Sequence, residues 1–170
     1  MSVTTINILL FGIGNVGSTL LKQIEESRDF IAKQNGIVFN FPIIANSTVV
    51  LFQNADQQQA WETDFKRSSI PYQFQDILDF LKNTQLENLI AVDVTASDVM
   101  LGRYLPLVQH GCHLVAANKK PNTVDLNFYS LLRSELAVQR KQFLYETNVG
   151  AGLPIIQTLR NLYQAGERIT

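Results

Sequence analysis

The segment that most constrains the fold lies near the N-terminus, where an apolar run ends directly in a glycine-rich turn. Residues 6–11 read Ile-Asn-Ile-Leu-Leu-Phe, residues 12–17 read Gly-Ile-Gly-Asn-Val-Gly, and a helical pattern follows at once. A strand, a G-x-G-x-x-G turn and a helix, in that order, are typical of a site that binds a dinucleotide diphosphate at the helix N-terminus. Gly12 permits the tight turn, Gly14 lets the backbone approach the phosphates, and Gly17 lets the helix pack close to the strand. The alternative is a turn that is rich in glycine only for packing.

Composition excludes several classes of protein. The 170 residues are enough for one domain with a sizeable core, and their net charge of −1 provides no field that would attract nucleic acid or an anionic membrane. Cys112 is the single cysteine, so neither an intrachain disulfide nor a cysteine-based zinc site is possible. The N-terminus lacks the basic region of a signal peptide, and the first apolar run is too short to span a bilayer. We therefore expect a cytoplasmic protein with no nucleic-acid or membrane partner.

Hydrophobic periodicity predicts alternating strands and helices along the chain. Strands are expected at residues 6–11, 37–45, 89–95, 113–117 and 142–146. Helices are expected at residues 16–35, 60–66, 76–82, from 97 or 98 to 110, and at 125–140 and 153–164. This alternation favours an α/β, Rossmann-type, doubly wound and mostly parallel sheet with helices on both faces. We expect one dinucleotide-binding domain over residues 1–170, cut from a longer protein at a domain boundary.

In an open parallel sheet, ligands bind beyond the carboxyl ends of the strands, so the residues that follow each strand form the candidate site. The candidate cofactor-binding residues are Gly12, Ile13, Gly14, Asn15, Val16, Gly17, Asn46, Ser47, Thr95, Ala96, Ser97 and Lys119. Asn46 and Ser47 stand where NAD sites often have an Asp or Glu that accepts from the ribose hydroxyls. No carboxylate is present there to repel a 2′-phosphate, and no arginine follows directly to attract one. The segment therefore favours NADP slightly and leaves NAD open, unless both residues serve only the turn.

Lys119 is the candidate catalytic residue. It follows the apolar residues 114–117, which puts it near the expected nicotinamide end of the cofactor. A lysine in a partly desolvated cleft loses some preference for its charged form and can exchange a proton with a carbonyl or hydroxyl oxygen. From spacing alone, a surface lysine after a strand is an equally good interpretation, and Lys120 is expected to point to solvent.

Glu146 precedes a second glycine-rich turn, Val149-Gly-Ala-Gly152, which opens a helix. Irregular backbone leaves carbonyl groups free, and carbonyls together with one carboxylate suit a hard cation such as sodium. From the residues alone, a turn that serves packing is the simpler interpretation. Asp93 lies within an apolar strand, so it needs hydrogen-bond partners if it is buried. His110 and His113 flank a helix end and are interpreted as structural.

The chain resembles the nucleotide-binding half of homoserine dehydrogenase, above all the form that is fused to aspartokinase. The segments that carry the resemblance are residues 11–17, 45–47 (Ala-Asn-Ser), 92–97 (Val-Asp-Val-Thr-Ala-Ser), 117–123 (Ala-Asn-Lys-Lys-Pro-Asn-Thr) and 143–154 (Phe-Leu-Tyr-Glu-Thr-Asn-Val-Gly-Ala-Gly-Leu-Pro). The last two are much more specific than the glycine turn, and all occur in the family's order. The resemblance implies NAD(P)-dependent interconversion of L-homoserine and L-aspartate 4-semialdehyde, a step in the biosynthesis of threonine and methionine.

The resemblance also implies roles for single residues. Lys119 matches an active-site lysine near nicotinamide and substrate, and Thr95 matches a threonine that lines the cofactor. The matches to the family's monovalent-cation site are Glu146, Val149, Ala151 and Leu153. The family's substrate-binding carboxylates, a second catalytic lysine and the surface that makes a homodimer lie in a C-terminal domain absent from these residues. We therefore expect a monofunctional protein, or a piece of a larger one, that binds nucleotide and turns over its amino-acid substrate poorly by itself.

Other interpretations of the sequence stay open. The chain fits the cofactor domain of a different NAD(P)-dependent dehydrogenase, a non-catalytic dinucleotide-sensing domain, or an S-adenosylmethionine enzyme, which also uses a glycine-rich first turn. A pure sensor, however, has no use for the Asn-Lys motif at residues 118–119 or for the Gly-Ala-Gly-Leu-Pro motif at residues 150–154.

Overall fold

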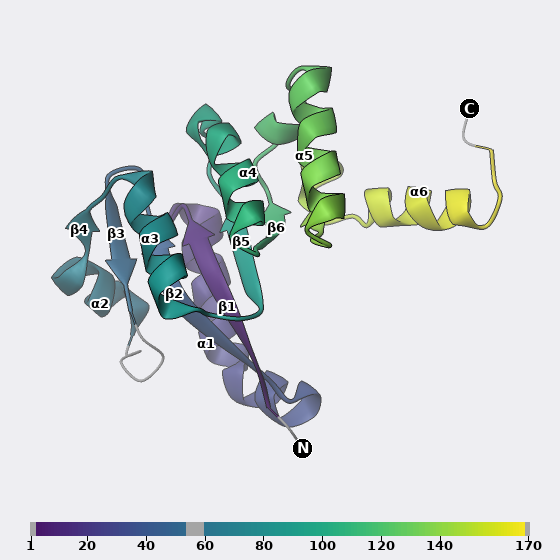
Figure 1. The fold of residues 1–170 in the computed structure, drawn as a ribbon. Helices are drawn as coiled ribbons and strands as arrows, with labels where there is room; N and C mark the ends of the chain where they lie inside the picture. Colours follow the sequence, from purple (N-terminus) through teal and green to yellow (C-terminus); the bar gives the residue numbers. More distant parts are fainter. Residues whose placement is uncertain (1–2, 54–59, 169–170) are drawn as a thin grey trace.

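The computed structural model describes residues 3–53 and 60–168, in which the strands form one seven-stranded sheet (Figure 1). The strands are β1 (Thr4–Phe11), β2 (Ile37–Ala45), β3 (Val49–Phe52), β4 (Ile70–Pro71), β5 (Leu89–Asp93), β6 (His113–Ala116) and β7 (Phe143–Leu144). The helices are α1 (Asn15–Asn35), α2 (Trp61–Ser68), α3 (Phe74–Thr84), α4 (Leu101–Gln109), α5 (Leu126–Val138) and α6 (Ile155–Gln164). Short 3₁₀ turns follow three of the strands: η2 (Asp98–Met100), η3 (Lys120–Asn122) and η4 (Glu146–Asn148).

The strand order β4-β3-β2-β1-β5-β6-β7 places β1 at the centre of the sheet. β1 pairs in parallel with β2 on one side and with β5 on the other, and β6 and β7 continue the parallel part. The strands of the first half of the chain therefore lie on one side of β1, and the strands of the second half lie on its other side. The carboxyl ends of β1 and β5 flank this switch point, which is where open α/β sheets bind their ligands. The expected Rossmann-type, mostly parallel sheet is confirmed.

Helices cover both faces of the sheet, as expected. Alternate residues of β1 point to opposite faces, with Leu9 and Phe11 on one side and Ile8 and Leu10 on the other. The first face packs against α3, α4 and α5, and the second against α1 and α2, which is visible in Figure 1 as two layers of helix around the sheet. Both sets of β1 side chains are almost fully buried, so the centre of the sheet is the core of the domain.

The hairpin strands β3 and β4 were missed by the sequence analysis. After β2 the chain turns back, β3 pairs antiparallel with β2, and β4 pairs antiparallel with β3. The apolar run of β3 is only Val-Val-Leu-Phe, which is too short for periodicity to identify. The polar stretch between β3 and β4 contains α2, close to the predicted short helix, while residues 54–59 lie outside the described residues.

Several predicted boundaries shift because 3₁₀ turns replace the ends of regular elements. The helix predicted from residue 97 or 98 begins with η2, for which Ser97 is the N-cap, its hydroxyl oxygen accepting from the Val99 N–H at 3.2 Å. The strand predicted at 142–146 contains only two paired residues, since Glu146 already belongs to η4. These turns carry the chain out of the sheet at the edge where the candidate site residues lie.

The last helix, α6, projects away from the sheet in Figure 1. None of its residues is buried, although Leu159, Leu162 and Tyr163 are large and apolar or aromatic. No helix in the described part of the chain has the length and apolar character needed to cross a bilayer.

Candidate functional site

The glycine turn after β1 is held in a conformation that only glycine satisfies at two positions. Gly12 has a φ of +101°, and a Cβ there would lie 3.1 Å from Cγ2 of Thr95 and 3.2 Å from the Val94 carbonyl group. A Cβ on Gly17 would collide with the carbonyl oxygen of Gly12. The roles expected for Gly12 in the tight turn and for Gly17 in close packing of helix on strand are therefore confirmed.

The N-terminus of α1 is open for an anion. Gly14 is the N-cap, and a Cβ added to it would meet no atom within 4 Å. The first hydrogen bond within the helix is donated by the Ser18 N–H to the Gly14 carbonyl at 2.9 Å. The N–H groups of Asn15, Val16 and Gly17 come before it and therefore have no acceptor within the helix. In the described residues no side chain caps this end, and the first turn carries no acidic residue. Free N–H groups and the positive end of the helix dipole suit a phosphate group.

A buried hydrogen-bond cluster begins at Asp93, the last residue of β5, which is 3% exposed. Its carboxylate accepts from the Tyr104 hydroxyl at 2.7 Å, from Asn118 Nδ2 at 2.9 Å and from the Thr95 N–H at 2.9 Å. Burial, the Asp93 charge and the hydrogen bond to it raise the pKa of Tyr104 far above its ordinary value, so Tyr104 stays a donor. Asp93 therefore has the partners that the sequence analysis required of it.

Asn118 joins the loops that follow three neighbouring strands. Its Nδ2 also donates to the Ser97 carbonyl at 3.0 Å, and its Oδ1 accepts from the Lys120 N–H at 3.1 Å. Its own carbonyl accepts from Nδ2 of Asn148 at 3.3 Å. The Asn118 side chain thus fixes the loop after β5 to the loop after β6, and its backbone carbonyl connects them to the loop after β7; the residue is 2% exposed. The position of Asn118 directly after the apolar residues 114–117 is the sequence signal for this role.

The two lysines of this loop, Lys119 and Lys120, are both exposed. Lys119 is exposed, so the partly desolvated cleft expected around it is not formed by the residues that the structure describes. Lys120 is exposed, as expected, and its Nζ pairs at the surface with Oδ1 of Asp98 at 3.1 Å. The surface interpretation of Lys119, which the sequence left open, fits the described residues, and its catalytic role stays a prediction.

Asn46 and Ser47 follow β2 beside a small cavity of about 140 Å³. Oδ1 of Asn46 accepts from the N–H groups of Thr48 and Val49, both at 2.8 Å, and so closes the β2–β3 turn. Gly12, Thr95 and Ser97 line the same cavity, and Ala96 is exposed between the last two. Residues from three separate loops therefore meet at one end of the candidate site. Tyr72 and Arg103 also line this cavity and were missed, because only the tertiary fold brings α4 and the segment after β4 to this point.

A larger hollow of about 700 Å³ lies on the α1 side of the sheet. Asn15 and Val16 line it from the first turn of α1, and Ala117, Glu146 and Thr147 line it from the ends of β6 and β7. Ile13 packs against the core on this side. The first turn and the residues that follow the last two parallel strands therefore face the same space.

The Glu146 carboxylate lies at the start of α6. Both of its oxygens are 3.2 Å from the Gln157 N–H, in the first turn of that helix. The Leu153 carbonyl accepts from the Ile155 N–H at 2.8 Å. Within the described ranges, the carbonyls of Val149 and Ala151 accept no hydrogen bond. These oxygen atoms are the group that the sequence analysis considered for a cation.

Comparison with known proteins agrees with this arrangement. Residues 12–146 match the family described as homoserine dehydrogenase, NAD binding domain. The chain is 40% identical over 166 residues to the bifunctional aspartokinase/homoserine dehydrogenase of Buchnera aphidicola, and 36% identical over 165 residues to that of Haemophilus influenzae. These alignments cover 97% and 96% of this chain but 20% of each relative, so the chain spans about a fifth of the length of the curated relatives it matches.

Solved structures share the fold. A hyperthermophilic archaeal homoserine dehydrogenase in complex with NADPH has a TM-score of 0.72 at 25% identity, covering 92% of this chain and 48% of that one. Residues 12–146, which match the family, contain the glycine turn, the Asp93–Asn118 cluster and Lys119. The ligand class of a domain of this family is a nicotinamide dinucleotide. The resemblance stated from the sequence is confirmed, and the chain belongs to the homoserine dehydrogenase NAD-binding domain family.

Proposed function

We propose that this chain is the cofactor-binding part of an enzyme that interconverts L-homoserine and L-aspartate 4-semialdehyde. The observation that carries the proposal is the Asn118 side chain, which ties the loops after β5 and β6 together beside the open N-terminus of α1. A dinucleotide that spans these loops would have its reactive ring next to Lys119. Family membership supports the same reaction class.

In this proposal the diphosphate accepts hydrogen bonds from the free amides at residues 15–17, and the lack of a side chain at Gly14 gives it room. The adenosine half occupies the cavity beside Asn46 and Ser47, with Thr95, Ala96 and Ser97 on its other side. Because no carboxylate lines that cavity, we propose that NADP is preferred over NAD.

The bound dinucleotide would supply or accept the hydride. Lys119 would donate a hydrogen bond from its ammonium group to the substrate oxygen and stabilise negative charge on that oxygen as the aldehyde is reduced. The backbone around Lys119 is anchored on both sides, because Asn118 is buried and its Oδ1 holds the Lys120 N–H. Such anchoring fixes the point from which the lysine side chain extends and so limits the space that its ammonium group can reach.

We also propose that Glu146 and the carbonyls of Val149, Ala151 and Leu153 hold a monovalent cation such as sodium. One carboxylate and unpaired carbonyls are the hard oxygen donors that such an ion prefers. The Leu153 carbonyl already accepts one hydrogen bond and retains a second acceptor position. If the site forms in this chain, replacing sodium by tetramethylammonium at constant ionic strength lowers the thermal midpoint, and Glu146→Gln removes that difference.

The substrate-binding carboxylates, a second catalytic lysine and the homodimer surface belong, in this proposal, to a domain separate from residues 1–170. The support is that the chain spans about a fifth of its curated relatives, and that α6 has no buried residue. The cytoplasmic location stays a prediction.

The test is a chimera in which this chain replaces the matching region of the Buchnera aphidicola bifunctional enzyme. We expect the chimera to oxidise L-homoserine with NADP⁺, followed as the appearance of reduced nicotinamide, and to leave L-malate and L-serine untouched. The unmodified Buchnera enzyme is the positive control. A chimera that unfolds cooperatively and binds NADPH but does not oxidise homoserine would contradict the proposal. Oxidation of another hydroxy acid would indicate a different dehydrogenase.

A further inference from the structure

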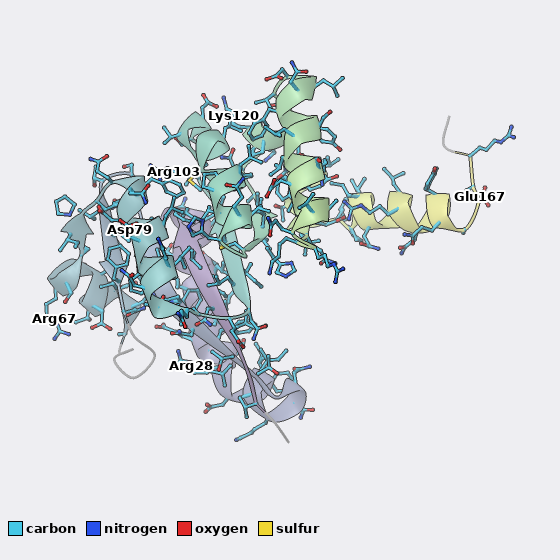
Figure 2. The ribbon with its side chains drawn as sticks, in the orientation of Figure 1. Arg28, Arg67, Asp79, Arg103, Lys120 and Glu167 are labelled. Carbon is cyan, nitrogen blue, oxygen red and sulfur yellow. The ribbon has the colours of Figure 1, made fainter. Side chains whose placement is uncertain are left out.

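A guanidinium group lies at the adenosine end of the candidate site. Arg103 projects from α4 into the 140 Å³ cavity that Asn46, Ser47 and Ser97 also line. In Figure 2, Arg103 lies toward the same end of the sheet as Lys120, whereas Arg28 of α1 lies at the opposite end. No arginine follows β2 in the sequence, but the fold supplies one from a helix on the other side of β1.

Arg103 is held in place by aromatic side chains. Its Nη1 donates to the Tyr72 hydroxyl at 3.1 Å, and that hydroxyl donates to the Asn46 carbonyl at 3.1 Å. Its Cζ lies 5.8 Å from the centre of the Tyr72 ring and 5.1 Å from the centre of the Phe74 ring. Packing against ring faces restricts the guanidinium plane and leaves most of its N–H donors unused. The group is therefore oriented before any ligand arrives, which reduces the entropy cost of binding.

The positive charge of Arg103 has no anionic partner in the described part of the chain. Arg67 pairs with Asp64 and Lys120 pairs with Asp98, but Arg103 forms no such ion pair, and no acidic residue lines its cavity. A guanidinium fixed by its neighbours, with free donors and no carboxylate, is suited to an anion that offers two oxygens at once.

We infer that Arg103 binds the 2′-phosphate of NADP(H) and makes this chain selective for NADPH over NADH. The inference rests on the proposed function, which puts the adenosine ribose beside Asn46 and Ser47. Two guanidinium N–H groups would donate to two oxygens of the 2′-phosphate, a geometry that Lys cannot reproduce. The competing role is stacking of the guanidinium on adenine, which would strengthen NADPH and NADH binding equally.

The test is calorimetric titration of the chain and of Arg103→Gln with NADPH and NADH, and with 2′,5′-ADP and 5′-AMP, which lack nicotinamide. For the unmodified chain we expect NADPH to bind at least about tenfold more tightly than NADH, as one charge-assisted bidentate contact allows. Arg103→Gln should remove most of this difference, lowering affinity for NADPH and 2′,5′-ADP while affinity for NADH and 5′-AMP stays within about twofold. Arg103→Lys should fall between the two, because it keeps the charge and loses the fork.

Arg160→Gln is the matched control. Arg160 donates from Nη2 to the Tyr145 hydroxyl at 3.3 Å and lies with its Cζ 5.4 Å from that ring, so the same kind of arginine–tyrosine pair is lost on α6. Both cofactor affinities should be unchanged in this variant. Tyr72→Phe, which removes the hydroxyl that orients Arg103, should lower selectivity in part.

The outcomes separate the inference from the proposal on which it rests. Equal weakening of NADPH and NADH in Arg103→Gln would indicate stacking on adenine and overturn the inference, as would unaltered selectivity. If the unmodified chain binds NADPH and NADH equally tightly, the inference about Arg103 is wrong, while the proposed dinucleotide site still stands. A folded chain that binds neither contradicts the dinucleotide site itself. Retained NADH binding shows that the Arg103→Gln variant is folded.

Discussion

Nδ2 of Asn118 lies 2.9 Å from a carboxylate oxygen of Asp93, and both side chains are almost completely buried. Asp93 ends β5 and Asn118 follows β6, so this hydrogen bond joins the two strands on one side of the switch point. The same Asn118 side chain holds the backbone on the far side of Lys119. The pair therefore links the stability of the sheet to the position of the candidate catalytic residue.

Replacing Asp93 should destabilise the domain strongly. Asp93→Ala removes the acceptor of the Tyr104 hydroxyl, the Thr95 N–H and Asn118 Nδ2. This loss should lower the unfolding free energy by about 3 kcal/mol. Tyr104→Phe removes one donor and leaves the others paired, so about 1 kcal/mol is expected. Urea unfolding measures both. A larger loss for Tyr104→Phe than for Asp93→Ala would show that the carboxylate is not the centre of the cluster.

A side chain at Gly17 should also be destabilising. Its Cβ would collide with the Gly12 carbonyl oxygen, so Gly17→Ala should lower the unfolding free energy by about 2 kcal/mol through overpacking. Gly102 in α4 is the control, because a Cβ there meets no atom within 4 Å and Gly102→Ala should stabilise the helix by about 0.5–1 kcal/mol. Thermal or urea unfolding distinguishes the two. Equal effects would mean that helix α1 does not pack tightly on β1.

His113 should make stability depend on pH. Burial lowers the pKa of His113 below its ordinary value of 6.5, and the positive charge of Lys141 acts in the same direction. Nδ1 of the neutral ring accepts a hydrogen bond from the Gln142 N–H. The unfolded chain therefore binds more protons in this range, so stability is complete above pH 6.5 and falls as the pH drops toward the folded pKa. Urea midpoints at several pH values should show this slope, and His113→Gln should flatten it. An unchanged slope in that variant would assign the effect to other groups.

Lys119→Ala should separate chemistry from cofactor binding. In the chimeric enzyme we expect turnover of homoserine to fall by a factor of roughly 10² or more while NADPH still binds, because Lys119 acts on the substrate oxygen. Lys120→Ala is the neighbouring control, since Lys120 is engaged with Asp98, and its turnover should stay close to that of the parent. Steady-state kinetics and a binding titration provide both readings. Unchanged turnover in Lys119→Ala would remove this residue from the mechanism.

The sequence was sufficient for the parts of the fold that depend on local patterns. The glycine turn and the apolar strands at residues 6–11 and 37–45 predicted the centre of the sheet, because strand, turn and helix signals are contiguous there. β3 and β4 were missed because they are four and two residues long and form only by pairing, β3 with β2 and β4 with β3. Short hairpin strands are determined by tertiary pairing rather than by periodicity.

The site was predictable to the extent that its residues follow strands. Thr95, Ser97 and Asn46 do so and were identified, and they meet around one cavity with Gly12. Arg103 lies within a helix that has its own core contacts, so nothing in its local sequence indicates that it points into this cavity. The sequence left open whether Lys119 is exposed, because its exposure depends on which other elements cover the loop.

The most direct measurement is calorimetric titration of the folded chain and of Gly14→Val with NADPH. The Gly14 position is open, so the variant should fold with only the small loss of thermal midpoint that a poorer N-cap causes, while its side chain occupies the space that the diphosphate needs. We predict saturable binding by the chain and affinity at least about tenfold lower in Gly14→Val. A demonstrably folded chain that takes up no NADPH, or a Gly14→Val variant that binds it as tightly as the parent, would contradict a dinucleotide site at the N-terminus of α1.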